Sequence, residues 1–212
     1  MEKTTTELTN EYIKEHPDIK SCLKRGLINY SSLARLIAKE LGTEKKTSKE
    51  AILIAARRFQ EKLKKEVSYE KKIRNLLSMS EIEIKNKIAV FILEKNINFD
   101  YVDDIQKKVR KESGTFYMIE GSGNYIIITQ EKYAAEIKSR FKLKIIKENK
   151  DLALINFKSP KEIEHTYGVV AYLTSLFAEN GVNIVEFMSC WTDTLFVIES
   201  KDVSKTLNFL RF

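Results

Sequence analysis

The residue types best suited to covalent or metal chemistry are scarce in this sequence. Its 212 residues include two Cys and two His, which lie far apart as His16, Cys22, His165 and Cys190. Two cysteines are too few for a disulfide framework, and these four side chains lack the spacing of a zinc site. His165 and Cys190 could act as base and nucleophile, yet the sequence indicates no third group to orient them. We therefore predict that the protein is not an enzyme and holds neither a metal nor a cofactor.

One glycine-rich stretch, Gly121-Ser122-Gly123-Asn124, has the composition of a phosphate-binding loop. It joins two strand-like segments, however, and no helix beginning with Lys and Ser or Thr follows it. We interpret it as a hairpin turn. The neighbouring carboxylates Glu81/Glu83 and Asp103/Asp104 stand in alternating or helical-surface patterns that are typical of solvated charge. The sequence therefore favours binding over catalysis.

The net charge of +7 is distributed unevenly along the chain. Residues 1–78 hold 18 Lys and Arg against 11 Asp and Glu, residues 79–150 hold 14 against 11, and residues 151–212 hold 5 against 8. Such a gradient is typical of a basic module that meets polyanions, joined to a module with another task. The alternative is a lysine-rich surface that only maintains solubility.

The sequence predicts only helices for residues 1–78. A first helix, from about Thr6 to Leu23, is expected to be interrupted near His16-Pro17, because proline disfavours a helical conformation at the residue before it. A second helix over Tyr30–Leu41 carries leucine and isoleucine at helical spacing, and Gly42 is a suitable stop.

A third predicted helix carries basic side chains that could contact nucleic acid. Thr47-Ser48-Lys49-Glu50 has the form of a capping box that opens this helix, and the apolar spacing over Phe59–Leu77 predicts that it continues as a connector. Three short helices with a basic last one resemble a helix-turn-helix DNA reader. The expected phosphate contacts are Lys45, Lys46, Lys49, Arg57 and Arg58. Because the helix start lacks side chains suited to base edges, a helical dimerisation or docking module is the alternative.

Residues 79–212 show strand and helix patterns in two passes. The first pass predicts strands at Ile88–Leu93, Thr115–Glu120, Tyr125–Thr129 and Leu143–Lys147, with helices after Asn98 and at Glu131–Phe141. The second predicts strands at Asp151–Phe157, Val182–Ser189 and Thr194–Ile198, with helices at Gly168–Asn180 and from Ser200 to about Leu210. The second half of each pass aligns with that of the other at a spacing of 70 residues. The expected fold class is α+β, a helix-turn-helix-like helical domain followed by two tandem ferredoxin-like βαββαβ units.

The second unit resembles the ACT domain family, small amino-acid-binding regulatory modules found in aspartate kinase and related biosynthetic enzymes. The resemblance covers about 60 residues. Gly168 opens a helix of small and leucine-like residues, and Gly181-Val182-Asn183-Ile184 leads into the second strand. With the front segment Asn29–Ile37, the whole chain resembles archaeal ACT-containing proteins predicted to regulate amino-acid metabolism. The implied organisation is a helical domain at 1–78 and ACT-type units at 79–150 and 151–212.

The resemblance also implies a ligand site. In ACT domains the effector lies at an interface between two domains, against the first strand-to-helix turn and the start of the second strand. The corresponding residues here are His165, Thr166, Gly168, Val169, Val170, Asn183 and Ile184. Free N–H groups at a helix start favour a carboxylate. Tyr167 replaces the proline of many members, and its ring is expected either to line the pocket or to close it. Ser159-Pro160-Lys161-Glu162 has the form of a capping box, so the long loop is expected to hold a helical turn.

These observations lead to two functional hypotheses. The first is a cytoplasmic, homodimeric regulator of amino-acid metabolism, whose ACT units bind an amino acid and whose basic helices bind DNA. The second is a regulatory subunit or oligomeric interaction module that acts on a biosynthetic enzyme without binding DNA. The longest apolar run, Ile88–Leu93, is far shorter than the roughly 20 residues of a bilayer-spanning helix, and the N-terminus does not resemble a signal peptide, so we expect no membrane partner.

Overall fold

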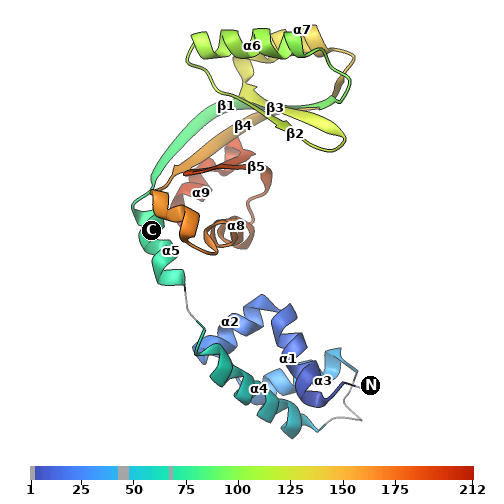
Figure 1. Cartoon of the computed structure of the whole chain (residues 1–212), viewed down its shortest axis with the longest axis vertical. Coiled ribbons are helices and arrows are strands. Elements are labelled where there is room, and N and C mark those ends of the chain that lie inside the picture. Colours follow the sequence, from blue (N-terminus) through green and yellow to red (C-terminus); the bar gives the residue numbers. More distant parts are fainter. Residues whose placement is uncertain (1–2, 43–47, 67–68) are drawn as a thin grey trace. The chain divides into compact units, whose positions relative to one another are not determined.

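A computed structural model of the chain describes residues 3–42, 48–66 and 69–212. Contacts divide the chain into unit 1, Met1–Ser68, and unit 2, Tyr69–Phe212 (Figure 1). The expected helical domain at 1–78 extends past this division by one helix, α5. None of the helices in the described part of the chain combines the length and apolar character that a bilayer crossing requires.

In its described part, unit 1 consists of helices α1 (Thr5–Glu15), α2 (Pro17–Arg25), α3 (Tyr30–Glu40) and α4 (Lys49–Leu63). The interruption between α1 and α2 confirms the prediction at His16-Pro17, because Pro17 is the first residue of the second helix. Helix α4 packs against α1 and α3. Their inward faces form a core that includes Ile13, Ile37, Ile52 and Leu63. Whether these helices act as a helix-turn-helix remains a prediction.

The start of α4 differs from the predicted capping box. Ser48 is the N-cap, and its Oγ accepts a hydrogen bond from the Glu50 N–H at 3.2 Å. Thr47, the predicted cap, lies outside the described residues. Lys45 and Lys46 lie outside them as well.

The predicted connector through Leu77 is wrong, because α4 ends at Leu63 and a separate helix, α5, spans Glu70–Ser78. The charged residues Lys64, Lys65 and Glu66 follow Leu63 and are exposed, so they offer no apolar face that would continue the helix. Helix α5 buries its own apolar side chains, Ile73, Leu76 and Leu77, in the core of unit 2.

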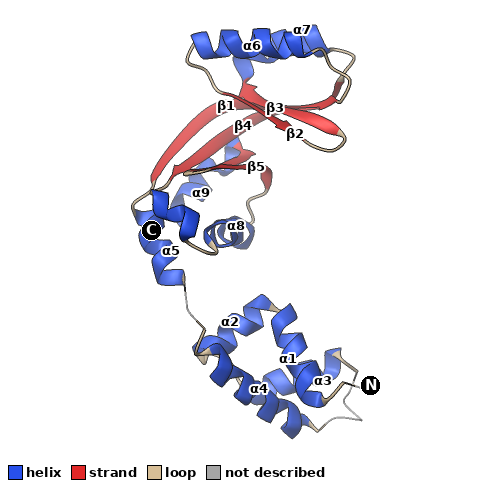
Figure 2. Cartoon of the chain, in the orientation of Figure 1, coloured by secondary structure: helices blue, strands red, loops and turns tan. Residues whose placement is uncertain are grey.

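Unit 2 is built on one six-stranded antiparallel sheet in the order β2-β3-β1-β4-β6-β5 (Figure 2). Its strands are β1 (Glu81–Glu94), β2 (Phe116–Glu120), β3 (Asn124–Gln130), β4 (Ile145–Lys158), β5 (Ile184–Cys190) and β6 (Asp193–Glu199). The central strands β1 and β4 curve along their length. The end of β1 pairs with β3, while its first residues, Glu81–Lys85, pair with the end of β4.

Helices cover the outer faces of the curled sheet (Figure 1). Helices α6 (Phe99–Lys111) and α7 (Ala134–Phe141) pack on the half that contains β2 and β3. Helices α5, α8 (Val169–Glu179) and α9 (Val203–Phe209) pack on the half that contains β5 and β6. The helix-free faces of the two halves pack together through side chains that include Val90, Ile128, Leu154, Leu195 and Val197. The sheet therefore folds over on itself as a sandwich between helices.

The predicted strands Leu143–Lys147 and Asp151–Phe157 prove to be the single strand β4. A β-bulge lets the polar segment between them stay in the sheet, with Asp151 in the left-handed region at φ 55°. Strand β1 has the same feature at Lys87, φ 56°. Because β1 and β4 each contribute to both halves, the halves are interleaved. The domain boundaries 79–150 and 151–212 remain a prediction.

Two predictions about loops are confirmed. Gly121–Asn124 forms the turn between β2 and β3, where the Gly121 N–H donates to the Asn124 carbonyl at 3.0 Å. The long loop before α8 contains a short 3-10 helix, η2, at Lys161–His165. Its start has no side-chain cap, because the Ser159 hydroxyl instead bonds with that of Ser80 at 3.0 Å.

Candidate functional site

The start of helix α8 is left open to an anion. Its N-cap is Gly168 at φ +87°, a conformation that disfavours any side chain, and neither a side-chain cap nor an acidic residue lies in the first turn. The first N–H groups of a helix have no partner within it and carry its positive dipole end. The related helix α6 is different, because Asn98 accepts from the Asp100 N–H at 3.0 Å and Asp100 adds a negative charge.

A hollow of about 280 Å³ lies at this helix start, and we call it the α8 pocket. Its lining residues are Ile163, Glu164, Thr166, Gly168, Val169, Val170, Ala171, Ser189, Trp191 and Thr194. Thr194 is fully buried, and its Oγ1 has no hydrogen-bond partner among the described residues. A buried hydroxyl without a partner is unfavourable, so a ligand atom that bonded to it would remove this cost. Trp191, 62% exposed, forms part of the rim.

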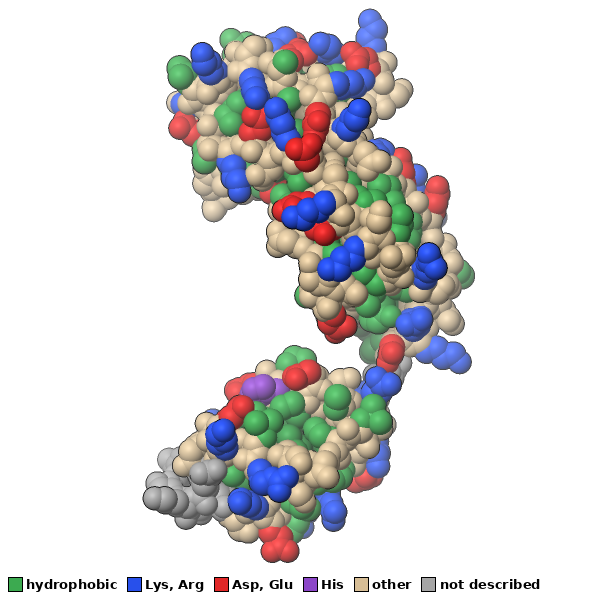
Figure 3. Space-filling view, turned by 180° about the vertical axis from the view of Figure 1, so that it is seen from behind, with side chains coloured by type: hydrophobic (Ala, Val, Ile, Leu, Met, Phe, Trp, Pro, Cys, Tyr) green, Lys and Arg blue, Asp and Glu red, His purple; other side chains and the backbone are tan. Residues whose placement is uncertain are grey.

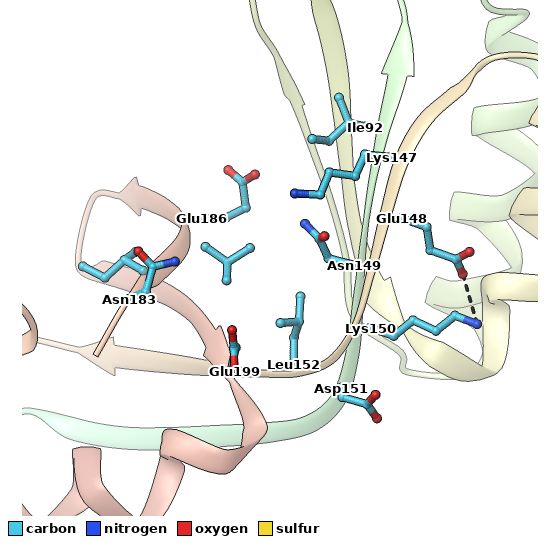
Figure 4. A pocket seen from close by; sticks show the side chains of 12 residues that line it. Ile92, Lys147, Glu148, Asn149, Lys150, Asp151, Leu152, Asn183, Glu186 and Glu199 are labelled. Carbon is cyan, nitrogen blue, oxygen red and sulfur yellow. Dashed lines mark ion pairs between the residues drawn. The ribbon is translucent and has the colours of Figure 1, made fainter. Parts of the chain in front are cut away.

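A second hollow, of about 640 Å³, lies where β4 bends, and we call it the crease pocket. Its lining residues are Ile92, Lys147, Glu148, Asn149, Lys150, Asp151, Leu152, Asn183, Ile184, Val185, Glu186 and Glu199. Figure 4 shows the amine of Lys147 and the carboxylate of Glu186 directed toward one another across the opening. The side chains of Glu148 and Lys150 point away from it and form an ion pair at 3.2 Å.

A bulge in β5 determines where Glu186 points. The register with β6 shifts between Ile184 and Glu186. Ile184 packs on the helix side of the sheet, and Phe187 lies 5.2 Å from the ring of Phe196 on that same side. The two residues between them, Val185 and Glu186, therefore both turn to the opposite side. Burial raises the pKa of the Glu186 carboxyl above its ordinary value.

The structure distributes the predicted ligand residues over two hollows. Thr166, Gly168, Val169 and Val170 line the α8 pocket, whereas Asn183 and Ile184 line the crease pocket. His165 is exposed at the end of η2 and lines neither. Their role as ligand contacts remains a prediction.

Tyr167 does not line the α8 pocket, although the sequence raised that prospect. It is 71% exposed and packs edge-on against Tyr69 of the segment preceding α5, with ring centroids 5.3 Å apart.

Four side chains that shape the two hollows were not predicted, namely Thr194, Trp191, Lys147 and Glu186. One of them left a signal in the sequence. Glu186 is the single charged residue within the apolar run Ile184–Met188, and a lone carboxylate in such a run indicates either a solvated face or a binding role.

The predicted nucleic-acid contacts in the described part of the chain are Lys49, Arg57 and Arg58. All three are exposed on α4, and none forms an ion pair with a described residue. The Arg57 guanidinium lies 5.2 Å from the ring centroid of Tyr30. On the face shown in Figure 3, however, basic side chains are scattered among acidic ones and do not form one patch.

Comparison with known proteins gives matches by structure only. No family model matches the sequence. No curated protein matches it either. Among solved structures, the aspartate kinase of Clostridium acetobutylicum matches with a TM-score of 0.50 and 16% identity, over 61% of this chain and 33% of the kinase. Aspartokinase alpha and beta subunits match with a TM-score of 0.50 and 10% identity, over 64% of this chain and 95% of that chain.

A third match is the regulatory subunit of aspartate kinase from Thermus thermophilus, with a TM-score of 0.47 and 12% identity over 61% of this chain and 92% of that one. The present chain spans about a third of the length of the Clostridium enzyme. Because unit 1 makes up less than a third of this chain, matches of this extent include unit 2. Unit 2 thus has an ACT-type fold, like that of part of aspartate kinase.

Proposed function

We propose that this protein regulates amino-acid metabolism by binding an amino acid in the α8 pocket of unit 2. The observation that carries the proposal is the uncapped start of α8 beside the unpartnered hydroxyl of Thr194. A helix start that lacks a cap offers N–H donors to a carboxylate, and the buried hydroxyl adds a further donor. The fold supports the proposal, since the matching Clostridium kinase is described as an allosteric enzyme.

The other lining residues fit the rest of such a ligand. The N–H groups of Val169 and Val170 would hold its carboxylate. Glu164 places an exposed carboxylate at the rim, where it would attract the ammonium group. Trp191 and Ile163 provide apolar surface for a side chain.

Helix α5 is placed to respond to the pocket. A Cβ at Gly168 would lie 3.5 Å from Ile73 Cδ1, and Tyr69 packs on Tyr167, so this helix contacts the loop that borders the pocket. In sequence, α5 directly follows unit 1. A ligand that moved this loop would change the packing of α5, which is the differential contact that a regulatory switch needs.

The proposal includes a cytoplasmic homodimer joined through unit 2. Strands β2 and β5 end the sheet, and each has only one neighbour in it. Such edges present unpaired backbone groups that a second copy can pair with.

The proposal can be tested with the fluorescence of Trp191, the only tryptophan in the chain. Titration with each of the twenty amino acids at millimolar concentration should reveal at least one that changes its emission. The Thr194→Val variant should weaken that ligand about 5- to 10-fold, as expected for one lost hydrogen bond.

Thr206→Val is the matched control for this test. Thr206 is likewise fully buried with an unpartnered Oγ1, but it does not line the α8 pocket. Its variant should bind like the wild type. No emission change with any amino acid would contradict the proposal, and so would equal weakening in both variants.

A second candidate function is DNA binding by unit 1. Lys49, Arg57 and Arg58, which are exposed and form no ion pair with a described residue, favour it. Their number is small, so the competing hypothesis is that unit 1 docks on a protein, such as a biosynthetic enzyme.

A further inference from the structure

The crease pocket holds one cation and one anion that are not neutralised within the described part of the chain. Neither Lys147 nor Glu186 forms an ion pair with a described residue. Of the other charged groups of the lining, Asp151 also forms no ion pair with a described residue, but its carboxylate points away from the opening (Figure 4), and the rest are paired. Glu148 pairs with Lys138 at 2.8 Å and with Lys150 at 3.2 Å, and Glu199 pairs with Lys201. The opening is therefore left with one positive and one negative charge, on opposite walls.

The placement of Glu186 is not one that packing alone favours. Without the bulge at Val185, regular alternation would turn residue 186 toward the apolar core beneath α8. The bulge instead directs the carboxylate into the pocket, where partial burial disfavours its charge. Bulges of this kind commonly re-aim a side chain beside a functional site.

The remaining walls combine an amide with aliphatic surface. Asn149 points toward the opening from β4 (Figure 4). Ile92 of β1, Leu152 of β4 and Val185 of β5 add apolar side chains. Pockets that bind small ligands typically join mostly apolar walls to a few placed polar groups.

We propose that the crease pocket is a second binding site, for a small zwitterion of the aliphatic α-amino acid class. Lys147 pairs with the carboxylate, to which the Asn149 amide also donates, and Glu186 pairs with the ammonium. The aliphatic side chain lies against Ile92, Leu152 and Val185. This site is separate from the α8 pocket and does not depend on it.

A ligand in this position would connect the two halves of the sheet. Its contacts come from the central strands β1 and β4, which both halves share, and from the edge strand β5. Binding would therefore favour the folded-over arrangement of the sandwich and stabilise unit 2.

Calorimetric titration of the full chain with L-leucine tests this proposal. Two analogues with the same side chain each lack one charge: 4-methylpentanoate has no ammonium and L-leucinamide has no carboxylate. Leucine should bind, and each analogue should bind at least about 10-fold more weakly. The reason is that a hydrogen bond to a charged group is stronger than one between neutral groups, and each analogue loses one such bond. Lys147→Gln and Glu186→Gln should each weaken leucine binding by a similar factor.

Matched controls remove the same charges elsewhere on unit 2. Lys107 and Glu179 are exposed and line neither pocket, so Lys107→Gln and Glu179→Gln should leave the affinity unchanged. Circular dichroism and melting temperature establish that each variant is folded. The double variant Lys147→Glu/Glu186→Lys should recover part of the lost affinity, which a merely structural role would not produce.

Three results would overturn the proposal: absence of leucine binding at millimolar concentration, equal affinity for leucinamide, or unchanged affinity in both charge variants. Trp191 separates the two sites, since it lines only the α8 pocket. If Thr194→Val abolishes leucine binding while Lys147→Gln and Glu186→Gln do not, the crease proposal fails and the proposed function stands. If leucine binds through Lys147 and Glu186 while no amino acid changes the Trp191 emission, the crease proposal stands and the α8 site fails.

Discussion

Among single residues, Glu186 shows most clearly how a binding role can conflict with stability. Burial raises the pKa of its carboxyl, so ionisation of this side chain is less favourable in the folded state than in the unfolded state. The charged residues that line the pocket with it include Lys147 of β4 and Glu199 of β6, and no ion pair joins Glu186 to either. A neutral side chain of the same shape should therefore make the protein more stable and less able to bind.

We expect Glu186→Gln to raise the melting temperature at pH 7 and to have a much smaller effect near pH 4. The sign follows from the raised pKa: well below the ordinary carboxyl value the wild-type side chain is protonated in both states, and the penalty develops as pH rises from that value to the higher folded-state pKa. A shift of one full pKa unit corresponds to about 1.4 kcal/mol. The increase in the free energy of unfolding should be smaller than this, because the side chain is partly exposed to solvent. Thermal melts of both proteins from pH 4 to pH 8 measure it. A variant that was less stable at pH 7 would contradict this account.

The residues of the α8 pocket were easier to predict than those of the crease pocket. Gly168 marks a helix start in the sequence itself, and the residues beside it follow by adjacency. Lys147 and Glu186 are far apart in sequence, and they meet only because β4 bends and β5 carries a bulge. A bulge breaks the period-two alternation from which side-chain direction is inferred, so no pattern in the sequence brings these two residues together.

At the level of elements, helix starts and stops were predictable because they depend on local chemistry. Asn98 caps the helix that was expected to follow it, and Gly42, the expected stop, lies just past the end of α3 at φ +61°. Strand continuity was not predictable. The segment Glu148–Asp151 is mostly charged and has the composition of a loop, yet Glu148 and Asn149 stay paired with β1, while Lys150 and Asp151 are exposed to water at the bulge.

The two left-handed residues in β1 and β4 lead to a prediction about strand stability. Lys87 and Asp151 are both the seventh residue of a 14-residue strand, so the same bend occurs twice. Lys87→Val and Asp151→Val should each cost about 1–2 kcal/mol, because a β-branched residue is strained at positive φ. Lys87→Gly should avoid this loss, because glycine adopts that conformation freely.

Lys85→Val is the control for this prediction, since Lys85 lies in the same strand but is not among the positive-φ residues. Its ion pair with Glu83 is partly exposed to solvent and contributes little, so the change should stay within about 0.5 kcal/mol. Urea unfolding of each variant gives the free energies. Equal losses at positions 85 and 87 would show that the lost lysine, rather than the backbone conformation, is responsible.

At the scale of the whole molecule, the division into two units separates the two candidate functions. The core of unit 1 is formed by residues of α1–α4 and the loops between them, and the three other apolar cores lie within unit 2. The basic surplus lies in the first third of the chain, whereas both pockets belong to unit 2. If the charge has a polyanion as its partner, DNA binding should be lost when unit 1 is removed, while amino-acid binding should remain.

A fragment of residues 69–212 should therefore fold, and its affinity for amino acids should lie within about 2-fold of that of the full chain, because changes away from a binding site usually have small effects. The same fragment should not shift duplex DNA in a gel. The full chain should shift it, with affinity falling steeply between about 50 and 200 mM salt. Arg57→Ala/Arg58→Ala should lower the magnitude of the salt slope by about two, one for each phosphate contact. The control variant Lys107→Ala/Lys111→Ala, which removes two charges from unit 2, should leave the salt slope unchanged. If the full chain bound no DNA at low salt, the exposed arginines of α4 would instead belong to a surface that docks on another protein.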